Sequence, residues 1–163
     1  MTEPVQPVTA DPKTAPIVAA AAAAGVEIHP VRFEVPTRTA QEAADAVGCG
    51  VGQIVKSLVF ATPNGHVLLL VSGANRVDPS AAARLGTGEL SRADADTVKR
   101  VTGYSIGSTP PFGHSAPLEA FMDEDLLSYQ EVWAAGGRPD TVFAIAPRDL
   151  ARISAAVLGR LAG

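Results

Sequence analysis

The chain has 163 residues, of which 47% are hydrophobic, and this length and composition suit one globular domain with a sizeable core. Its formal net charge of −4 argues against binding of nucleic acid by a broad basic surface, because phosphate neutralisation drives such binding, but a local contact to a nucleic-acid end stays open. A single cysteine, Cys49, excludes an intramolecular disulfide and a cysteine-rich zinc site, and it predicts a reducing, cytoplasmic compartment.

The N-terminal part of the chain predicts a tail that leads into the folded domain. Four prolines among the first sixteen residues indicate a flexible tail over residues 1–14, followed by a single domain over residues 15–163. The tail has no basic region and the alanine run after it is short, so neither an export signal nor a membrane span is predicted. An alanine-rich helix is expected over 17–24, ending at Gly25, with a strand over 26–35.

The middle of the chain contains the clearest local signals. Thr39 and Glu42 have capping-box spacing and predict a short helix over 40–47. Pro63-Asn64-Gly65 lies between two apolar runs and predicts a hairpin that pairs 54–61 with 66–72. Cap and turn signals further along predict a helix at 79–85 and a second helix that Ser91 with Asp94 opens and that runs to about Val101. They also predict strands at 104–107, 117–122, 129–133 and 141–145, and a C-terminal helix from Pro147.

This order of elements predicts the fold class. Six or seven strands with interspersed helices indicate an α/β (α+β) protein with a mixed sheet or barrel. The helices are clustered unevenly, and no strand is followed by a glycine-rich phosphate fingerprint, which disfavours a Rossmann or P-loop fold.

Lys56 interrupts the apolar run Ile54 to Phe60 within the first hairpin strand. Strand alternation places Lys56 beside Leu58 on one face and Ser57 on the other, and both faces are mainly apolar. An unpaired, desolvated ammonium costs several kcal/mol or loses its proton. The position therefore implies a partner, a ligand or an opening to solvent.

The second unusual segment is residues 102–114, TGYSIGSTPPFGH. Three glycines and two adjacent prolines constrain its backbone path, and such a loop can present N–H groups to a carbonyl or phosphate. A plain turn between two strands is the alternative from composition alone. His114 at its end suits either a contact to substrate, as an acid or base, or a hydrogen bond to the backbone.

Several of these motifs, in this order, resemble the YbaK-like proteins, which share the insertion domain of bacterial prolyl-tRNA synthetases and remove wrong amino acids from tRNA. The resemblance covers about residues 26 to 152. The matching segments are the helix Thr39 to Val47, the strand Val55 to Phe60, Leu70-Val71-Ser72-Gly73, Thr102-Gly103-Tyr104, the Gly-x-x-x-Pro loop Gly107 to Pro111 with Phe112-Gly113-His114, Asp123, Ala135-Gly136 and Pro147-Arg148-Asp149-Leu150.

The resemblance implies a mixed, β-barrel-like sheet with flanking helices, no cofactor and no metal. It implies that Lys56 is the catalytic residue and that the Gly-x-x-x-Pro loop positions an aminoacyl ester. The partners that it implies are the 3′ end of a mischarged tRNA and an aminoacyl-tRNA synthetase. The candidate substrate-binding residues are Ser72, Gly73, Gly103, Gly107, Ser108, Thr109, Pro110, Pro111, Phe112, Gly113 and His114.

The resulting hypothesis is trans-editing: hydrolysis of the ester that joins a small amino acid to tRNA, with tRNA-Pro favoured. Lys56 would contact the terminal phosphate or the polarised carbonyl, and a positioned water would attack, so that no side-chain nucleophile is needed. One alternative is a module that binds aminoacyl-tRNA or an aminoacyl-nucleotide without hydrolysis. Another is a general ester hydrolase, although the chain lacks a Gly-x-Ser-x-Gly elbow. The sequence leaves the amino acid and the oligomeric state open.

Overall fold

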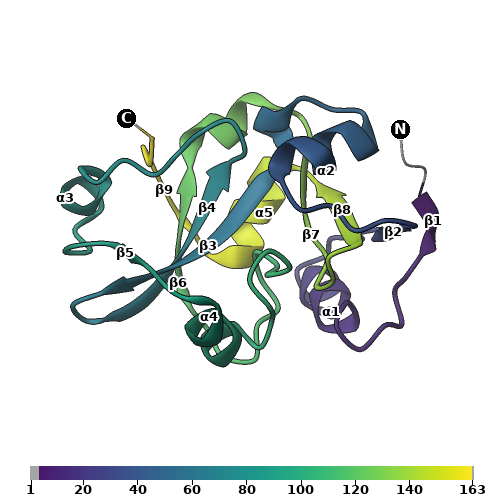
Figure 1. Ribbon diagram of the computed structural model, residues 1–163, viewed down its shortest axis with the longest axis horizontal. Helices are drawn as coiled ribbons and strands as arrows, with labels where there is room; N and C mark the ends of the chain where they lie inside the picture. The colour runs from purple at the N-terminus through teal and green to yellow at the C-terminus, as the bar shows by residue number, and fades with distance from the viewer. Residues whose placement is uncertain (1–3, 163) are drawn as a thin grey trace.

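The computed structural model describes residues 4–162 and contains two β-sheets with helices around them (Figure 1). The strands are β1 (Pro4–Pro7), β2 (Val31–Phe33), β3 (Val55–Thr62), β4 (Gly65–Ser72), β5 (Ser91–Arg92), β6 (Glu119–Asp123), β7 (Val132–Ala135), β8 (Thr141–Ile145) and β9 (Val157–Gly159). The α-helices are α1 (Ala15–Ala23), α2 (Ala40–Val47), α3 (Ala81–Leu85), α4 (Ala95–Thr102) and α5 (Pro147–Ser154), and short 3₁₀ turns are η1 (Val51–Gln53) and η2 (Glu124–Ser128). The strand orders are β1-β2-β8-β7 and β5-β3-β4-β6-β9.

The hairpin of β3 and β4 forms the centre of the five-stranded sheet, as predicted. Thr62 pairs with Gly65, so the turn consists of Pro63 and Asn64 alone. Gly65 has φ +139°, a conformation that a residue with a side chain rarely adopts, and this explains why glycine follows the turn. β6 then pairs with β4 in parallel, and β9 pairs with β6 in parallel. β4 is therefore an interior strand with a neighbour on each side.

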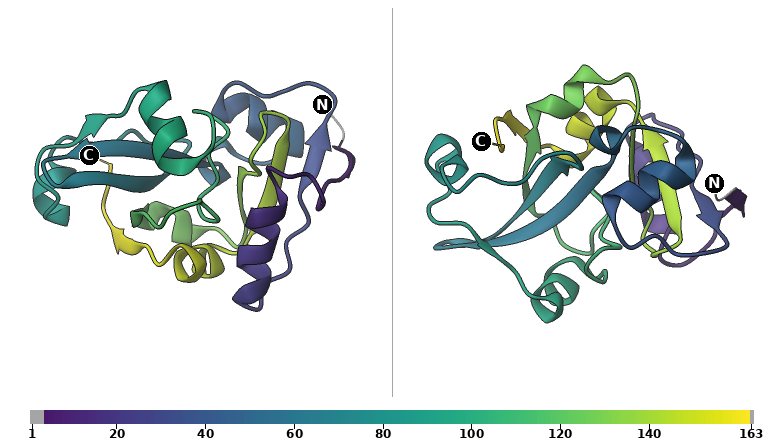
Figure 2. Two further views of the ribbon diagram at one scale, coloured as in Figure 1. Left: turned by 90° about the horizontal axis from the view of Figure 1, so that it is seen from below. Right: turned by 45° about the horizontal axis from the view of Figure 1, so that its top comes forward.

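Helices α1 and α2 cover opposite faces of the four-stranded sheet, as the two views of Figure 2 show. Ile17 of α1 packs in the main core with Phe143 of β8, whereas Ala46 of α2 packs with Val142 on the other face. The capping prediction for α2 is confirmed, because the Thr39 side chain accepts a hydrogen bond from the Glu42 N–H at 3.0 Å. No helix in the described part of the chain is long and apolar enough to span a membrane.

The prediction of a mixed α/β fold is confirmed, but three details differ. Residues 104–107 form a loop and not a strand, because Gly103 has φ +83° and the Ser108 N–H then closes a turn on the Ser105 carbonyl at 2.9 Å. The strand expected over 26–35 is limited to β2. The number of strands is larger than predicted, because β1, β5 and β9 are two to four residues long and have no alternating pattern of their own.

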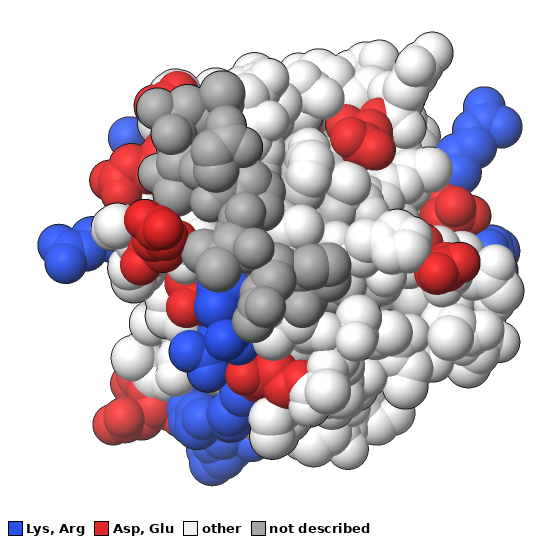
Figure 3. All heavy atoms as spheres, turned by 90° about the vertical axis from the view of Figure 1, so that its right-hand side faces the viewer, with Lys and Arg blue, Asp and Glu red and all other residues white. Residues whose placement is uncertain are grey.

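The segment predicted as a tail lies along the four-stranded sheet, where β1 pairs with β2. The Asp11 carboxylate accepts hydrogen bonds from Arg32 at 2.9 Å and Arg138 at 3.3 Å. The buried Thr14 hydroxyl donates to the Gly136 carbonyl at 2.7 Å. Figure 3 looks onto this end of the molecule and shows positive side chains gathered with negative ones among them. Flexibility of this segment stays a prediction.

Candidate functional site

A cavity of about 360 Å³ lies between the two sheets. Its walls are formed by α2 with the residues before it, by β3, and by β7 and β8 with the turn between them. The segment that runs from β5 into α4 and the loop after α4 complete the walls. Its lining residues are 37–40, Ala43, Val47, 54–59, Arg92, Ala93, Val98, Ile106, Gly107, Thr109, 133–135, 138–139 and 141–142. The cavity thus gathers residues that are up to about a hundred positions apart in the sequence.

One wall of the cavity is an open edge of β3. β5 pairs only with the far end of β3, and at the near end Ile54 forms a single bridge to Trp133. The Gly73 N–H donates to the Ile54 carbonyl at 2.7 Å, which sets the alternation of hydrogen bonds along the hairpin. In an antiparallel pair, alternate residues direct their N–H and C=O groups away from the partner strand. Ser57 is such a residue, so its backbone groups are directed away from β4 along this edge.

The Ser57 side chain carries a hydroxyl next to this edge that is unsatisfied in the described chain. Its Oγ atom is buried and has no hydrogen-bond partner within residues 4–162. Leaving a buried polar group unsatisfied costs about 1–3 kcal/mol, so such groups in native structures need an explanation. A ligand in the cavity that hydrogen-bonds Ser57 is one explanation.

The cavity is lined by cations and not by anions. Arg38, Lys56, Arg92 and Arg138 contribute to its wall, and its lining within the described chain contains no aspartate or glutamate. Arg138 is paired with Asp11 at 3.3 Å and Asp140 at 3.2 Å, so the other three carry the positive charge that is unpaired within residues 4–162. This contrasts with the net charge of −4 of the whole chain. The lining therefore favours an anionic ligand, and arginine and lysine are the residues that recognise phosphate and carboxylate groups.

Lys56 is held at the cavity by the turn that follows β4. Its Nζ donates a hydrogen bond to the backbone carbonyl of Asn75. The Asn75 side chain in turn donates to the carboxylates of Asp123 at 2.9 Å and Asp125 at 2.8 Å. Asp123 is buried and also caps η2. The apolar surroundings of Lys56 are thus offset by a fixed carbonyl partner and by the opening into the cavity.

The surroundings of Lys56 lower its pKa from the usual value of 10.5. Burial is the main cause, and the positive charges of Arg92 and Arg76 act in the same direction. Asp123 acts in the opposite direction. The protein therefore keeps an ammonium group at the cavity whose charge is not neutralised by an adjacent carboxylate, as a site that attracts an anion requires.

The rest of the lining is mainly apolar, with several threonines. It includes Ala40 and Ala43 of α2 and Ala134 and Ala135 of β7 beside larger residues such as Leu58 and Ile106. Trp133 closes one side and is half-buried. A volume of this size with a polar edge and a mainly apolar wall is typical of a small-molecule site.

The structure divides the predicted loop between two sites. Gly107 and Thr109 line the Lys56 cavity, and the Thr109 hydroxyl donates to the Ser105 carbonyl at 3.1 Å. Ser108 and Pro110 are buried beside them but do not line this cavity. The last residues of the loop line a second cavity of about 310 Å³; they are Pro111, Phe112, Gly113 and His114.

His114 belongs to that second cavity and not to the cavity of Lys56. Its Nε2 lies 2.7 Å from the Pro110 carbonyl, and its ring packs edge-on against Tyr104. Burial lowers its pKa, although the bond to Pro110 acts in the opposite direction. Between residues 4 and 162, no three His, Cys, Asp or Glu side chains come together as metal ligands would.

Three further predicted residues support the cavity walls from behind. The Ser72 hydroxyl donates to the Gly52 carbonyl at 2.7 Å. A Cβ at Gly73 would lie 2.4 Å from the Val51 carbonyl, so only glycine fits this close approach. Gly103 ends α4 in the left-handed conformation. Neither Ser72, Gly73 nor Gly103 lines the cavity, and their binding roles stay predictions.

Four residues of the cavity were not singled out from the sequence: Ser57, Arg38, Arg92 and Arg138. Ser57 could have been found, because it follows Lys56 and interrupts the apolar face of β3. The three arginines have no shared spacing or motif. Only the packing of the two sheets brings them together.

Comparison with known proteins assigns the chain to a family. The model of the aminoacyl-tRNA editing domain matches residues 34–153. Lys56 and the cavity lining lie within this range, whereas β1, α1 and β2 precede it. The chain therefore belongs to the aminoacyl-tRNA editing domain family, which confirms the predicted resemblance to YbaK-like proteins.

The relatives include free-standing proteins and parts of synthetases. The uncharacterized protein YwhH of Bacillus subtilis is 28% identical over 75% of this chain and 78% of its own length. Proline–tRNA ligases of Brachyspira hyodysenteriae and Staphylococcus aureus are 27% and 31% identical over about half of this chain, and each match covers only 15% of the ligase. A crystal structure provisionally assigned as a trans-editing enzyme for prolyl-tRNA synthetase is 45% identical, with a TM-score of 0.87 over 94% of this chain and 98% of that one.

Proposed function

We propose that this protein is a trans-editing deacylase that hydrolyses the ester between a small amino acid and the terminal ribose of a mischarged tRNA, with tRNA-Pro as the favoured tRNA. The observation that carries the proposal is the position of Lys56 at the mouth of a cation-lined cavity beside an open strand edge. Membership of the editing-domain family and the likeness to a protein provisionally assigned to prolyl-tRNA editing support the choice of substrate.

The charge of the cavity suits the 3′ end of a tRNA. The terminal nucleotides carry phosphates, and Arg38, Lys56 and Arg92 supply cations that form no ion pair within residues 4–162. Arg138, in contrast, is paired with Asp11 and Asp140. Concentrating the positive charge at one cavity explains how an acidic chain can bind a polyanion without a broad basic surface.

The apolar wall suits a small amino acid. Ala40, Ala43, Ala134 and Ala135 offer methyl groups but no hydrogen-bond partner from their side chains. Methyl groups discriminate weakly between small side chains, because one methylene is worth only about 1–3 kcal/mol. Alanine, serine, threonine and cysteine are therefore all candidate substrates.

The chemistry needs a positioned water and no covalent intermediate. Water attacks the ester carbonyl carbon, the bond from that carbon to the ribose oxygen breaks, and the ribose oxygen takes a proton. The amino acid leaves as its carboxylate, and the second proton of the water passes to solvent. Lys56 stabilises negative charge on the terminal phosphate or on the carbonyl oxygen, and the loop at Gly107 and Thr109 orients the ester.

Ser57 supplies the polar contacts that orient the amino acid. Its backbone N–H and C=O groups face away from β4, and its buried hydroxyl lacks a partner in the described chain. The α-ammonium group of an aminoacyl ester needs acceptors, and the Ser57 carbonyl and hydroxyl oxygens are acceptors. This contact would hold the ester carbonyl at a fixed position relative to Lys56.

The test is release of labelled amino acid from a panel of mischarged tRNAs. The panel includes tRNA-Pro charged with alanine, serine, threonine or cysteine, with Lys56→Ala and Lys56→Arg measured beside the wild type. Release from at least one member that depends on Lys56 would support the proposal and name the substrate. Tight binding of the charged tRNA with no release from any member would overturn it in favour of a non-hydrolytic binding module.

A further inference from the structure

The three lysines of the chain, Lys13, Lys56 and Lys99, share one property. Each donates to a backbone carbonyl, and none forms an ion pair with a carboxylate within residues 4–162. The ion pairs of the described chain are formed by arginine, apart from one histidine contact. Lys56 is the candidate catalytic group, which leaves Lys13 and Lys99 without an assigned role.

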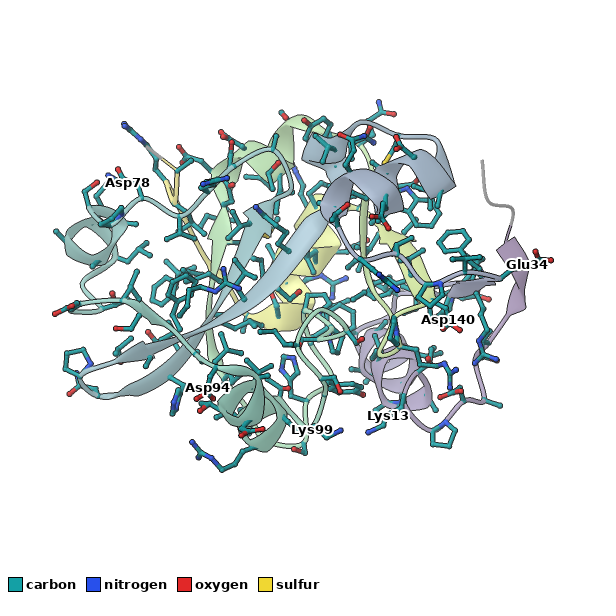
Figure 4. All side chains as sticks on the ribbon, viewed as in Figure 1. Lys13, Glu34, Asp78, Asp94, Lys99 and Asp140 are labelled. Carbon is teal, nitrogen blue, oxygen red and sulfur yellow. The ribbon has the colours of Figure 1, made fainter. Side chains whose placement is uncertain are left out.

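Lys13 and Lys99 converge on one atom. Both Nζ groups approach the carbonyl oxygen of Gly103, Lys13 at 3.5 Å and Lys99 at 3.4 Å. Figure 4 shows them reaching towards one another from the segment before α1 and from α4. The proximity of Lys13 lowers the pKa of Lys99, as expected for two like charges side by side.

The backbone positions of the pair are fixed. The Lys13 N–H donates to the Asp11 carboxylate at 2.8 Å, and the Lys13 carbonyl accepts a hydrogen bond from the Tyr104 hydroxyl at 2.8 Å. Lys99 lies in the last turn of α4, which ends at Gly103. Two different elements therefore hold two exposed ammonium groups near one point before any ligand arrives.

Capping of α4 does not explain this arrangement. One lysine is enough to interact with the carbonyl groups at the C-terminus of a helix, and Lys99 and Arg100 already stand in its last turn. A third cation from a distant segment adds repulsion. The Tyr104 ring, whose centroid lies 5.7 Å from the Lys13 Nζ, offsets part of that repulsion, and an anion between the two ammonium groups would relieve it further.

We propose that Lys13 and Lys99 bind a phosphate group of the RNA backbone outside the catalytic cavity. The inference rests on the proposed function, because it takes the substrate to be a tRNA. Gly103 begins the loop that carries Gly107 and Thr109 to the cavity, so the lysine pair lies at the outer end of a wall of the site. A lysine ammonium binds phosphate as a point charge, without a requirement for a particular base.

Lys13 also gives the N-terminal segment a role in the site. It lies outside residues 34–153, the range of the family match. Its backbone contacts to Asp11 and Tyr104 place this segment against the loop after α4. The segment would therefore add a contact to RNA that the editing domain alone does not supply.

The experiment measures the dissociation constant of an acceptor-stem RNA hairpin that ends in CCA, between about 50 and 200 mM KCl. Each phosphate contact contributes about 0.7–0.9 to the slope of log Kd against log salt concentration. The Lys13→Gln/Lys99→Gln variant is expected to bind about tenfold more weakly at low salt and to lose about 0.7–0.9 of the slope. The Lys13→Arg/Lys99→Arg variant keeps both charges and should keep the slope.

Arg148→Gln is the matched control, because Arg148 is exposed on α5 and forms no ion pair in the described part of the chain. A wild-type slope in the double glutamine variant, or an equal loss in Arg148→Gln, would overturn the inference. Inorganic phosphate, added at constant ionic strength, tests whether the lysine pair binds free phosphate and not a phosphate of the RNA backbone. If both lysines are needed to bind inorganic phosphate but the salt slope of RNA binding does not depend on them, the assignment to RNA would also be overturned.

The two proposals fail differently. If labelled amino acid is released in a Lys56-dependent way but the slope does not depend on Lys13 and Lys99, only the phosphate site is wrong. If the wild type neither releases amino acid nor binds the hairpin, both proposals are wrong.

Discussion

β3 and β4 are the two strands of one hairpin, but their surroundings differ: β4 is enclosed in the core, whereas β3 has an open edge at the cavity. β4 pairs with β3 on one side and β6 on the other, and its residues 68–71 are at most 1% exposed. β3 pairs fully with β4 but leaves the edge near Ser57 open to the cavity. Lys56 and Ser57, the polar residues that interrupt this strand, are at that edge.

The difference shows how one sheet separates stability from function. Where both edges of a strand are paired and both faces are covered, only apolar side chains avoid a desolvation penalty. Where one edge is open, polar backbone and side-chain groups can serve a ligand, at a cost in stability when the ligand is absent. Substitutions of Lys56 and Ser57 in β3 should therefore change activity, and substitutions of the buried leucines in β4 should change the free energy of unfolding.

Replacement of Lys56 by alanine should produce the largest effect on activity. Removal of one preorganised group that stabilises developing negative charge typically costs on the order of 10²- to 10³-fold in rate. The free energy of unfolding should not fall, because Lys56 is partly desolvated and its pKa is lowered mainly by burial. Release of labelled amino acid and thermal unfolding check the two parts. Turnover close to that of the wild type would contradict the assignment.

Replacement of Leu70 by alanine should have the converse effect. Leu70 is fully buried in β4, and a Leu→Ala change in a core typically lowers stability by about 2–5 kcal/mol. Leu158→Ala is the control, because Leu158 on β9 is 46% exposed and the same change there should cost well under 2 kcal/mol. Urea unfolding measures both, and an equal loss in the two variants would contradict the contrast.

Replacement of Ser57 by alanine should lower activity without lowering stability. Loss of one neutral hydrogen bond to substrate costs about 0.5–1.5 kcal/mol, which corresponds to about 2- to 12-fold in kcat/KM. The same change removes a buried hydroxyl that lacks a partner, so the free energy of unfolding should stay constant or rise. Ser57→Thr keeps the hydroxyl and is the control. A drop in stability with unchanged kcat/KM would assign Ser57 a structural role instead.

The smallest expected effect is the change of activity and of the free energy of unfolding with pH. The pKa of Lys56 lies below 10.5, so activity that needs the ammonium is complete below that pKa and falls as the pH rises through it. Lys56→Arg should move this fall to higher pH, because a guanidinium stays protonated. Between the folded-state pKa of Lys56 and 10.5, Lys56 binds a proton in the unfolded chain but has lost it in the folded protein. The free energy of unfolding should therefore rise with pH in this range. Unfolding of Lys56→Met over the same pH range should lack this rise.

The local elements were largely predictable because their signals span only a few residues. The Thr39 cap and the turn at Pro63-Asn64 act over three or four positions, and the structure has both where they were predicted. Residues 104–107 have strand-like side chains, but Gly103 has φ +83° and the Ser108 N–H closes a turn on the Ser105 carbonyl. The nonlocal failures were β5 and β9, because these short strands form only by pairing with β3 and β6.

By itself, the sequence determined that a lysine lies in an apolar hairpin strand, that the fold is mixed α/β, and that the motifs match an editing domain. These conclusions depend on turn chemistry, on capping and on the order of motifs along the chain. Only the tertiary structure decided that the β3 edge is open at Ser57 and that three distant arginines join Lys56 at one cavity. It also separated Gly107 and Thr109 from His114, which lines another cavity. Such convergence depends on how two sheets pack, and no short stretch of sequence encodes that packing.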